Sequence, residues 1–402
     1  MRIVFDGTTL RPGRTGVGYY TEHLLHHLAG ELEGRDEVVV VSNRLLETTA
    51  PLPPGVRVAR GAGLTLRLPW MQFSAPGILD TLDADVAHFT NSMVPLASPV
   101  PTVVTIHDMS LRLFPTCHPL RRLLLNRPLI NLAVRRVDAI ITVSHSARRD
   151  ILRFYDLPPE RVHVVHEAAA PAFAPVADRA HLAAVRQRYR LPARFVLYVG
   201  TIEPRKNLPR LIEAFGRRVL AGDLDCPLVC VGRYGWKARD VQERVEQLGL
   251  GRAVRFLGYV PFADLPAIYN LAELFVFPSL HEGFGLPAME AMACGGPVIV
   301  GRNSSLVEVA GDAAMTVEAT DVEAWGDALV HLTKDTDRRA DLARRGLARA
   351  RMFSWRRAAR ETLAIYRQVV ARAHADRSRP APSGLAFDEL VARPAAGERP
   401  AP

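Results

Sequence analysis

The chain has 402 residues, of which 48% are hydrophobic and 23% charged, and its formal net charge is +9. This composition is ordinary for a globular protein, and the length exceeds the roughly 250–300 residues at which a single core stops growing, so we expect two domains. No apolar run approaches the ~18 residues of a membrane span, and the four cysteines form no CxxC pair, which excludes an integral membrane protein and a zinc or disulfide framework. The first residues, MRIVFDG, predict a strand and not a signal peptide, so we expect a cytoplasmic protein.

The first part of the chain alternates short apolar segments with helical stretches. Strands are predicted over 2–6, 38–42, 86–89, 102–107, 139–144 and 162–166, and a helix over about 18–32. Each strand is almost continuously apolar, as expected for a parallel sheet that is buried on both faces. The repeated strand–helix–strand order predicts a doubly wound α/β domain over residues 1–170.

The segment EAAAPAFAPVADRA (167–180) interrupts this alternation and is a predicted linker, because it is rich in Ala and Pro and has no period. A helix is predicted over 208–220, with Asn207 as its cap. A second series of strands follows the linker, at 194–200, 227–232, 253–260, 273–279 and 297–301. This series predicts a second Rossmann-like domain over residues 171–353.

The end of the chain has two parts. Ser354 is a predicted cap for a helix that runs to about residue 372 and carries a stripe of apolar side chains. Residues 373–402 are rich in Pro, Ala and Arg, which predicts a disordered tail because this composition buries little apolar surface.

Ligands of open α/β sheets bind beyond the carboxyl ends of the strands, where the loop DGTTLRPGRTGVGYY (6–20) stands out. Its glycines let the backbone approach an anion near a helix start. A dinucleotide fingerprint fits badly, because the third glycine is missing and the second strand ends in Ser42 and Asn43 without an acid. From the residues alone, ligand binding and simple flexibility of this loop remain equally open.

The loop VGTIEPRKNLPR (199–210) places Arg205 and Lys206 directly before a predicted helix. Cations are disfavoured at a helix N-terminus, so this pair indicates an anion between them, and a phosphate group is the natural candidate. Lysine occurs in this chain only at Lys206, Lys237 and Lys334, which makes Lys206 more informative than an arginine. The alternative is a solvated surface pair.

The stretch HEGFGLPAMEAMACGG (281–296) combines a flexible turn with two acids. Glu282 precedes the predicted helix, and Glu290 lies one turn inside it. Carboxylates accept hydrogen bonds from vicinal hydroxyls, so one acid is suited to a ribose and the other to a transferred sugar. The alternative is that Glu290 only complements the helix dipole and Glu282 is exposed.

Several stretches, in the same order, resemble the family 4 retaining glycosyltransferases of GT-B fold over about residues 1–370. EGFGLPAME (282–290) resembles their E-x7-E motif. Further similar blocks are GVGYYT (16–21), PTVVTIHD (101–108), ITVSHSARRDI (141–151), VGTIEPRKN (199–207), FLGYVPFADLPAIYNLAELFVFPS (256–279) and FSWRRAA (353–359). The resemblance implies an α/β architecture of two Rossmann-like domains facing a cleft, with a C-terminal helix that returns to the N-terminal domain.

The resemblance also implies roles for the residues of the E-x7-E block. Glu290 would bind the ribose hydroxyls of a nucleotide, and Glu282 would hold the donor sugar. The backbone that would assist Glu282 belongs to Gly283, Phe284, Gly285 and Leu286.

Other matching residues would surround the diphosphate and the sugar. Lys206 would neutralise the diphosphate leaving group, Gly16 would approach the same phosphates, and His107 would lie at the sugar in the interdomain cleft. Many family members carry an arginine after the glycine of the diphosphate loop, where this chain has Thr201. Arg205 is the candidate replacement for that arginine. The predicted catalytic residues are His107, Lys206 and Glu282.

These implied roles predict a retaining, metal-independent hexosyltransferase that uses a nucleotide diphosphate sugar and needs no cofactor. The form GTIEPRKN resembles mannosyltransferases that use GDP-mannose. The acceptor, a saccharide or a lipid-linked saccharide, would contact N-terminal loops such as 60–75 and 109–127. One alternative is a glycoside hydrolase using Glu282 and Glu290, although a hydrolase has no diphosphate to neutralise. The other is a non-catalytic GT-B protein that binds sugar nucleotides.

Three D-x-D triplets, at 83–85, 223–225 and 335–337, could be read as metal sites. We interpret them as surface turns, because in the resembled family protein cations and helix ends take the place of a metal. Trp236 and Lys237 border either the nucleotide or a plain surface turn, and both interpretations stay open.

Residues 112–153 hold nine arginines, at 112, 121, 122, 127, 135, 136, 148, 149 and 153, and only two acids. Between the arginines lie leucines, as in RRLLLNRPLINLAVRR (121–136). Such a segment is suited to peripheral contact with the anionic inner membrane leaflet, and an ordinary helix with a solvated arginine face is the equally open alternative. We expect no nucleic-acid binding, because the segment lacks interleaved aromatic side chains for stacking.

Overall fold

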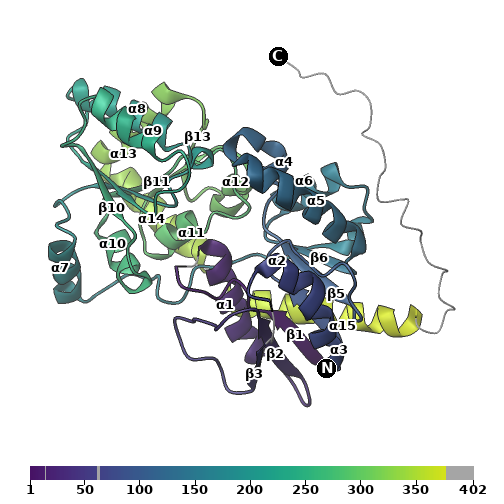
Figure 1. Cartoon of the computed structure of the whole chain (residues 1–402). Coiled ribbons are helices and arrows are strands. Elements are labelled where there is room, and N and C mark those ends of the chain that lie inside the picture. Colours follow the sequence, from purple (N-terminus) through teal and green to yellow (C-terminus); the bar gives the residue numbers. More distant parts are fainter. Residues whose placement is uncertain (14, 61–63, 377–402) are drawn as a thin grey trace, which may run out of the picture.

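The structure is a computed structural model that describes residues 1–13, 15–60 and 64–376. The predicted disorder of residues 377–402 therefore lies outside the described residues, whereas residues 373–376 continue the last helix. Two α/β lobes follow one another along the chain, and Figure 1 shows them side by side with helices α1 and α11 between them.

In the described residues, the first sheet has seven strands in the order β3-β2-β1-β4-β5-β6-β7, and all the pairings are parallel. The strands are β1 (Arg2–Asp6), β2 (Glu37–Ser42), β3 (Val56–Arg60), β4 (Val86–Phe89), β5 (Thr102–Ile106), β6 (Ala139–Thr142) and β7 (Val162–Val164). The six predicted strands are confirmed. The edge strand β3 escaped prediction, because its sequence VRVAR alternates polar and apolar residues and lacks the continuous apolar run of a buried strand.

The second sheet has six strands among the described residues, again all parallel, in the order β10-β9-β8-β11-β12-β13. The strands are β8 (Val196–Val199), β9 (Leu228–Val231), β10 (Val254–Gly258), β11 (Leu274–Phe277), β12 (Val298–Gly301) and β13 (Met315–Val317). The five predicted strands are confirmed, and each is shorter than predicted. The short edge strand β13 was missed. The two sheets establish the doubly wound α/β class.

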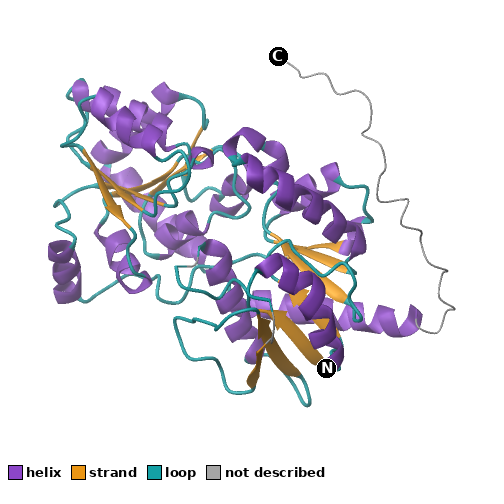
Figure 2. Ribbon diagram, viewed as in Figure 1, coloured by secondary structure: helices purple, strands orange, loops and turns teal. Residues whose placement is uncertain are grey.

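Helices cover both faces of each sheet (Figure 2). In the first lobe they are α1 (Gly16–Ala29), α2 (Arg67–Pro69), α3 (Ala75–Thr81), α4 (Ser110–Leu113), α5 (Leu120–Arg136) and α6 (His145–Phe154). In the rest of the chain they are α7 (Arg179–Arg188), α8 (Leu208–Leu220), α9 (Arg239–Gln247), α10 (Leu265–Leu271), α11 (Leu286–Ala293), α12 (Ser304–Ala310), α13 (Val322–Lys334), α14 (Thr336–Ala350) and α15 (Trp355–Asp376). A π-helical turn spans Trp70–Ser74, and 3-10 turns span Pro115–Cys117, Pro159–Arg161, Pro204–Lys206 and Phe262–Asp264.

Helix α15 returns to the first lobe, as predicted, and packs against α1, β4 and β6 (Figure 1). Its Tyr366 hydroxyl lies 2.5 Å from Nδ1 of the buried His88, whose Nε2 lies 2.8 Å from the Thr105 hydroxyl. Burial lowers the pKa of His88 to about 3, so this imidazole is neutral. The last helix of the chain is therefore tied to the central strands of the first sheet.

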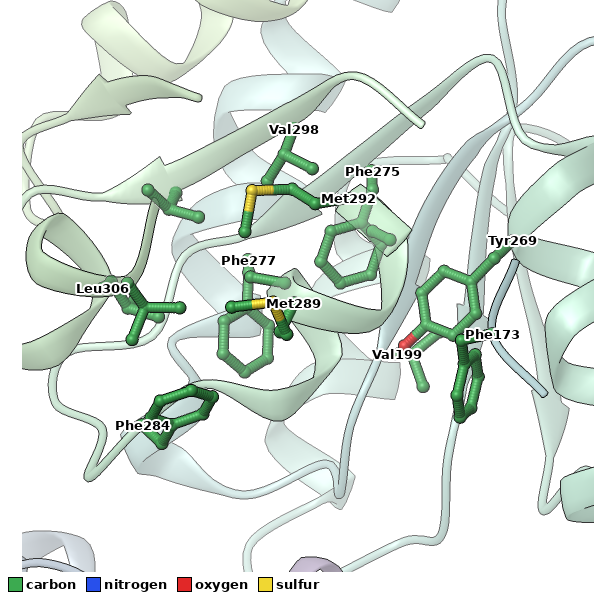
Figure 3. Close-up of a cluster of buried hydrophobic side chains, with 14 of the residues drawn as sticks. Phe173, Val199, Tyr269, Phe275, Phe277, Phe284, Met289, Met292, Val298 and Leu306 are labelled. Atoms are coloured by element: carbon green, nitrogen blue, oxygen red, sulfur yellow. The ribbon is translucent and has the colours of Figure 1, made fainter. Parts of the chain in front are cut away.

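The core of the second lobe fixes α11 in position. Figure 3 shows Met289 and Met292 of this helix beside Phe275 and Phe277 of β11, with Phe284 at the start of the helix. These side chains are all almost completely buried. Burying apolar side chains of this size stabilises a fold by about 1.5–3 kcal/mol each. The position of the helix backbone, and so of Glu290, is set by this packing.

One local prediction was wrong. The side chain of Asn207 does not cap α8: its Oδ1, the capping atom, accepts from Arg210 (3.0 Å), and its Nδ2 donates to the carbonyls of Pro278 (3.1 Å) and Ala319 (2.6 Å). The predicted linker over 167–180 is a loop as far as residue 178, and Ala168, Ala170 and Phe173 within it are buried. The position of the domain boundary at residue 170 stays a prediction.

The first two D-x-D triplets lie in irregular segments between a helix and a strand, as interpreted, whereas the third is no turn, because Thr336 and Asp337 begin helix α14. The first two precede β4 and β9, at the amino ends of the sheets, and Asp335 caps α14. Their location is opposite to the carboxyl ends of the strands, where ligands bind.

Candidate active site

The predicted diphosphate loop and the E-x7-E loop meet because β8 and β11 are neighbours in the second sheet. Lys206 lies at the end of the turn after β8, and Glu282 lies in the loop after β11. The Nζ atom of Lys206 is 2.6 Å from Oε1 of Glu282. A terminal nitrogen of Arg205 lies 3.1 Å from the other oxygen, Oε2. The Ser279 hydroxyl also donates to Oε1. Glu282 is thus held on both oxygens, and the two loops form one charged network.

The Lys206–Glu282 pair is buried, which makes its electrostatics strong. Burial raises the pKa of the Glu282 carboxyl, but Arg205 and Lys206 outweigh this effect and bring the pKa down to about 2. Burial lowers the pKa of Arg205, and Glu282 with Asp108 and Glu203 outweighs it, so that this pKa is raised. Glu282 is therefore a firmly ionised carboxylate and a poor proton donor.

Both terminal nitrogens of Arg205 are engaged within the protein, whereas its buried Nε has no hydrogen-bond partner among the described residues. Besides Glu282, its guanidinium pairs with Glu203 (3.0 Å) and donates to the His281 carbonyl (2.5 Å). It is also close enough to Asp108 to hold the pKa of that carboxyl well below its usual range, against the opposing effect of burial. That Arg205 replaces the arginine missing at position 201 stays a prediction. Its contacts within the protein leave the guanidinium little freedom to bind a diphosphate.

Glycine at 283 and 285 is required by the geometry of the turn before α11. A Cβ on Gly283 would lie 2.0 Å from the carbonyl oxygen of His107, so the E-x7-E loop touches the first lobe through a residue without a side chain. Gly285 has a φ of +99° at the N-cap position of α11, and a Cβ there would lie 2.5 Å from Leu306. The side chain of Phe284 points into the core, which leaves its backbone for the predicted donor contact.

Glu290 lies in the second turn of α11, as predicted, and is half-buried. Its Oε2 accepts a hydrogen bond of 2.8 Å from the Tyr269 hydroxyl. Burial raises the pKa of the Glu290 carboxyl to about 7, and the nearby Glu167 contributes to the shift. Glu282 and Glu290 thus differ widely in proton affinity although they belong to one motif.

His107 directly follows β5 and lies in the cleft, with both ring nitrogens engaged. Nε2 lies 3.0 Å from the Thr90 carbonyl, and Nδ1 lies 3.3 Å from Oε1 of Glu167. The edge of its ring also contacts the ring of Tyr20, with 4.7 Å between the centroids. Its orientation is therefore fixed, with the buried Glu167 as its charged partner.

Glu167 is the residue that sequence reasoning missed. It belongs to the segment interpreted as a linker, yet it enters the cleft and lies near both His107 and Glu290. The available signal was the single acid in the first half of an otherwise Ala- and Pro-rich stretch, HEAAAPAF.

Gly16 is the first residue of α1, and a Cβ built on it would lie 4.0 Å from Leu286 at the start of α11. The glycine loop of the first lobe therefore faces the helix that carries Glu290. The sequence-predicted residues thus gather at the facing ends of the two sheets, and their roles toward a ligand stay predictions.

A cavity of about 150 Å³ opens beside the network on the side of the first lobe. Its lining includes Arg67, His107, Asp108, Arg122, Asn126 and Arg205. Arg67, Arg122 and Asn126 come from the two N-terminal segments predicted to contact an acceptor, and Arg205 connects the cavity to the charged network.

The comparisons with known proteins agree with this geometry. Residues 15–171 match the model "Glycosyltransferase Family 4", and residues 185–349 match "Glycosyl transferases group 1". The O-antigen chain mannosyltransferase B of Escherichia coli is 35% identical over 266 residues, which are 66% of this chain and 70% of that protein. The D-inositol 3-phosphate glycosyltransferase of Salinispora tropica is 36% identical over 253 residues, 59% of this chain and 52% of that protein.

Among solved structures, the sucrose-phosphate synthase of Thermosynechococcus elongatus superposes with a TM-score of 0.75 at 22% identity, covering 92% of this chain and 99% of that one. This likeness supports the fold. Together with the family models and the mannosyltransferase relative, it shows that the chain is a glycosyltransferase of family 4 with the two-domain GT-B fold.

Proposed function

We propose that this glycosyltransferase moves a hexose from a nucleotide diphosphate sugar to a saccharide or lipid-linked acceptor, with retention at the anomeric carbon and without a metal. Mannose is the favoured sugar and GDP-mannose the favoured donor, since the relative from Escherichia coli is named a mannosyltransferase. The observation that carries the proposal is the buried network of Lys206, Arg205 and Glu282 with Glu290 on the adjoining helix.

The network supplies the two kinds of contact that such a donor needs. The ionised Glu282 accepts hydrogen bonds from sugar hydroxyls, and Lys206 moves its ammonium toward the diphosphate as charge develops on the leaving oxygen. The bond between the anomeric carbon and the phosphate oxygen breaks while the acceptor oxygen bonds to that carbon on the same face. The acceptor proton passes to the departing phosphate oxygen, so no further base is needed.

The hydrolase alternative fits the site less well. A glycoside hydrolase needs one of its two carboxyls as a proton donor. Glu290, with a pKa of about 7, is suited to that task, but the other carboxyl, Glu282, would then have to attack the sugar or activate a water, and both of its oxygens are held by Lys206, Arg205 and Ser279. The non-catalytic alternative predicts binding without turnover.

A turnover assay tests the proposal. Purified full-length protein is offered a panel of nucleotide sugars with mannose oligosaccharide acceptors, and release of nucleoside diphosphate is followed with and without EDTA. We expect turnover with GDP-mannose that EDTA leaves intact, and an anomeric configuration in the product, read by NMR, that matches the donor. An inverted product, or activity that EDTA abolishes and manganese restores, would contradict the corresponding part of the proposal.

The surface of α5 supports the proposed membrane contact. Leu120 and Leu124 are 69% and 65% exposed, and Leu125 is exposed beside them. Arg121 and Arg127 are also exposed, and neither forms an ion pair with another described residue. No helix in the described part of the chain has the length and apolar composition needed to cross a bilayer. The proposed contact is therefore peripheral, with leucines in the headgroup region and arginines on anionic lipid.

Vesicle sedimentation distinguishes this contact from a solvated helix face. We expect binding to vesicles containing phosphatidylglycerol, weaker binding at high salt, and loss of binding in the double variant Leu120→Ser, Leu124→Ser. Leu220→Ser, an equally exposed leucine at the end of α8, is the matched control. Equal sedimentation with neutral and anionic vesicles, or none with either, would favour the solvated face.

A further inference from the structure

The charged network is short of positive charge for a diphosphate. Lys206 and Arg205 both pair with Glu282, and Arg205 also pairs with Glu203. Asp108 adds a third carboxylate close to Arg205. Two cations therefore face three carboxylates before a donor arrives. A diphosphate brings further negative charge into this site, so another cation has to contact it.

Arg233 lies in the loop after β9. Among the described residues, no ion pair and no side-chain hydrogen bond involves its guanidinium. The guanidinium carbon lies 4.4 Å from the centroid of the Tyr259 ring, in the loop after β10. A Cβ on Gly13 would lie 2.5 Å from both terminal nitrogens and 2.8 Å from the guanidinium carbon. The exposed side chain of Arg233 thus contacts an aromatic ring and approaches the glycine loop of the first lobe, and no described residue supplies an acidic partner for its charge.

The backbone places Arg233 directly beside the diphosphate loop. The Ile202 N–H donates to the Arg233 carbonyl at 2.9 Å, and a Cβ on Gly232 would lie 2.0 Å from the Gly200 carbonyl oxygen. Thr201 lies between these two contacts, and β8 and β9 are paired strands, about 4.8 Å apart. Arg233 is therefore a direct neighbour of Thr201, the position in the diphosphate loop where the arginine is missing.

The glycine loop connects Arg233 to the rest of the proposed phosphate site. Gly13 contacts Arg233 at the end of β9, and Gly16 faces Leu286 after β11. Since β8 lies between β9 and β11, Gly13 and Gly16 lie on either side of the end of β8, which the turn that carries Lys206 follows. A diphosphate bound at the end of β8 would have Lys206 on one side and Arg233 on the other.

We propose that Arg233 is the second cation of the diphosphate site and contacts the phosphate oxygens of the donor. It takes the place left by Thr201, while Arg205 stays engaged with Glu203 and Glu282. A guanidinium fork can form two parallel hydrogen bonds to phosphate oxygens, and stacking on Tyr259 orients its plane. This inference rests on the proposed use of a nucleotide diphosphate sugar and extends it by one binding residue.

Calorimetry with graded ligands tests the inference. GDP, GMP and guanosine, with UDP, UMP and uridine in parallel, are titrated into the full-length protein and into Arg233→Ala, Arg233→Lys and Arg239→Ala. We expect Arg233→Ala to weaken diphosphate binding at least tenfold, monophosphate binding less and nucleoside binding not at all. Arg233→Lys should recover part of the loss. Arg239→Ala removes an exposed charge at the start of α9 and should match the unaltered protein.

Each other result overturns the inference in a distinguishable way. An equal loss for the nucleoside and the diphosphate means that Arg233 contacts the base. Unchanged diphosphate affinity in a variant with native circular dichroism means that Arg233 lies outside the site. A diphosphate-specific loss in Lys237→Ala and none in Arg233→Ala assigns the role to the other cation of this turn, which lies over Trp236. If the unaltered protein neither binds nor turns over any of these nucleotides, the proposed function itself fails.

Discussion

Lys206 is buried and paired with the carboxylate of Glu282. This pairing determines how the substitution of Lys206 should affect folding and turnover. In Lys206→Ala, Arg205 and Ser279 still hold Glu282, so we expect a folded protein. Loss of a charge that stabilises the leaving group should lower kcat by about 10²–10³-fold, or roughly 3–4 kcal/mol. Nucleoside diphosphate release under saturating donor measures the effect.

The exposed Lys334 at the end of α13 provides the control for this variant, since Lys334→Ala removes the same charge far along the chain from the network. It should retain full turnover. Turnover close to normal in a folded Lys206→Ala protein would show that the leaving group does not depend on this ammonium.

Glu290 should make nucleotide binding depend on pH near neutrality. Burial raises its pKa to about 7, whereas accepting two ribose hydroxyls favours the ionised carboxylate. Nucleotide binding should therefore release a proton, and affinity should fall as pH drops below about 7, by at most roughly tenfold per pH unit. Calorimetry in two buffers of different ionisation enthalpy measures the released proton.

The variant Glu290→Gln keeps the shape of the side chain and cannot ionise. It should bind nucleotide more weakly at pH 8 and show no pH dependence between 6 and 8. A pH profile identical to that of the unaltered protein would assign the titration to another group.

Residues whose chemistry is unusual for their position could be found from the sequence, and those placed by a distant contact could not. A rare lysine before a helix and two acids around a glycine turn identified Lys206, Glu282 and Glu290 as one candidate site. Glu167 was missed because its meaning comes from His107, sixty residues earlier, which no local pattern connects to it. Arg233 was missed for a similar reason, since its neighbours belong to three different loops.

At the scale of elements, burial on both faces made the central strands predictable, because it imposes a continuous apolar run. Of the four edge strands, β7 and β10 were predicted, whereas β3 and β13 were missed. The bounds of α8 were predicted to the residue, yet its supposed cap Asn207 uses its side chain to join three loops. Helix starts can be predicted from local signals, whereas the partners of a polar side chain depend on tertiary structure.

Helix α6 shows an element completed by the other lobe. Its own Ser144 accepts from the Ala147 N–H, but the N–H groups of His145 and Ser146 donate to the two oxygens of Glu308 on α12, each at 2.9 Å. Burial raises the pKa of Glu308, and His166 with these N–H groups outweighs it, so the carboxylate is ionised at neutral pH. An anion at this helix N-terminus stabilises it by about 0.5–2 kcal/mol.

We therefore expect Glu308→Ala to speed hydrogen exchange at the first turn of α6, which lies in the opposite lobe, and to lower the Tm by a few degrees. Because the pKa of Glu308 is lowered, the same contact should be lost as pH falls below the ordinary glutamate range. Glu246→Ala, at an exposed position of α9, is the control. Unchanged exchange at His145 and Ser146 would mean that the two lobes are not joined through this carboxylate.

At the scale of the molecule, the two lobes meet through a few close contacts, and Gly283 makes the tightest of those described above. A Cβ at this position would lie 2.0 Å from the His107 carbonyl oxygen, which is backbone and cannot turn away. The φ of Gly283 is not in the left-handed region, so alanine is tolerated by its own backbone. Gly283→Ala should therefore leave each lobe folded and keep the two lobes slightly apart.

This separation should affect the reaction far more than nucleotide binding. Misplacing reacting groups by about 1 Å can lower a rate by about 10²-fold, whereas the proposed nucleotide contacts belong mainly to the second lobe. We expect the kcat of Gly283→Ala to fall by about 10²-fold and its GDP affinity to change by less than roughly threefold. Small-angle scattering with bound ligand should give a larger radius of gyration for this variant than for the unaltered protein. Gly251→Ala, at a turn where a Cβ meets nothing within 4 Å, should behave normally. Full activity in Gly283→Ala would mean that the lobes need not approach each other this closely for sugar transfer.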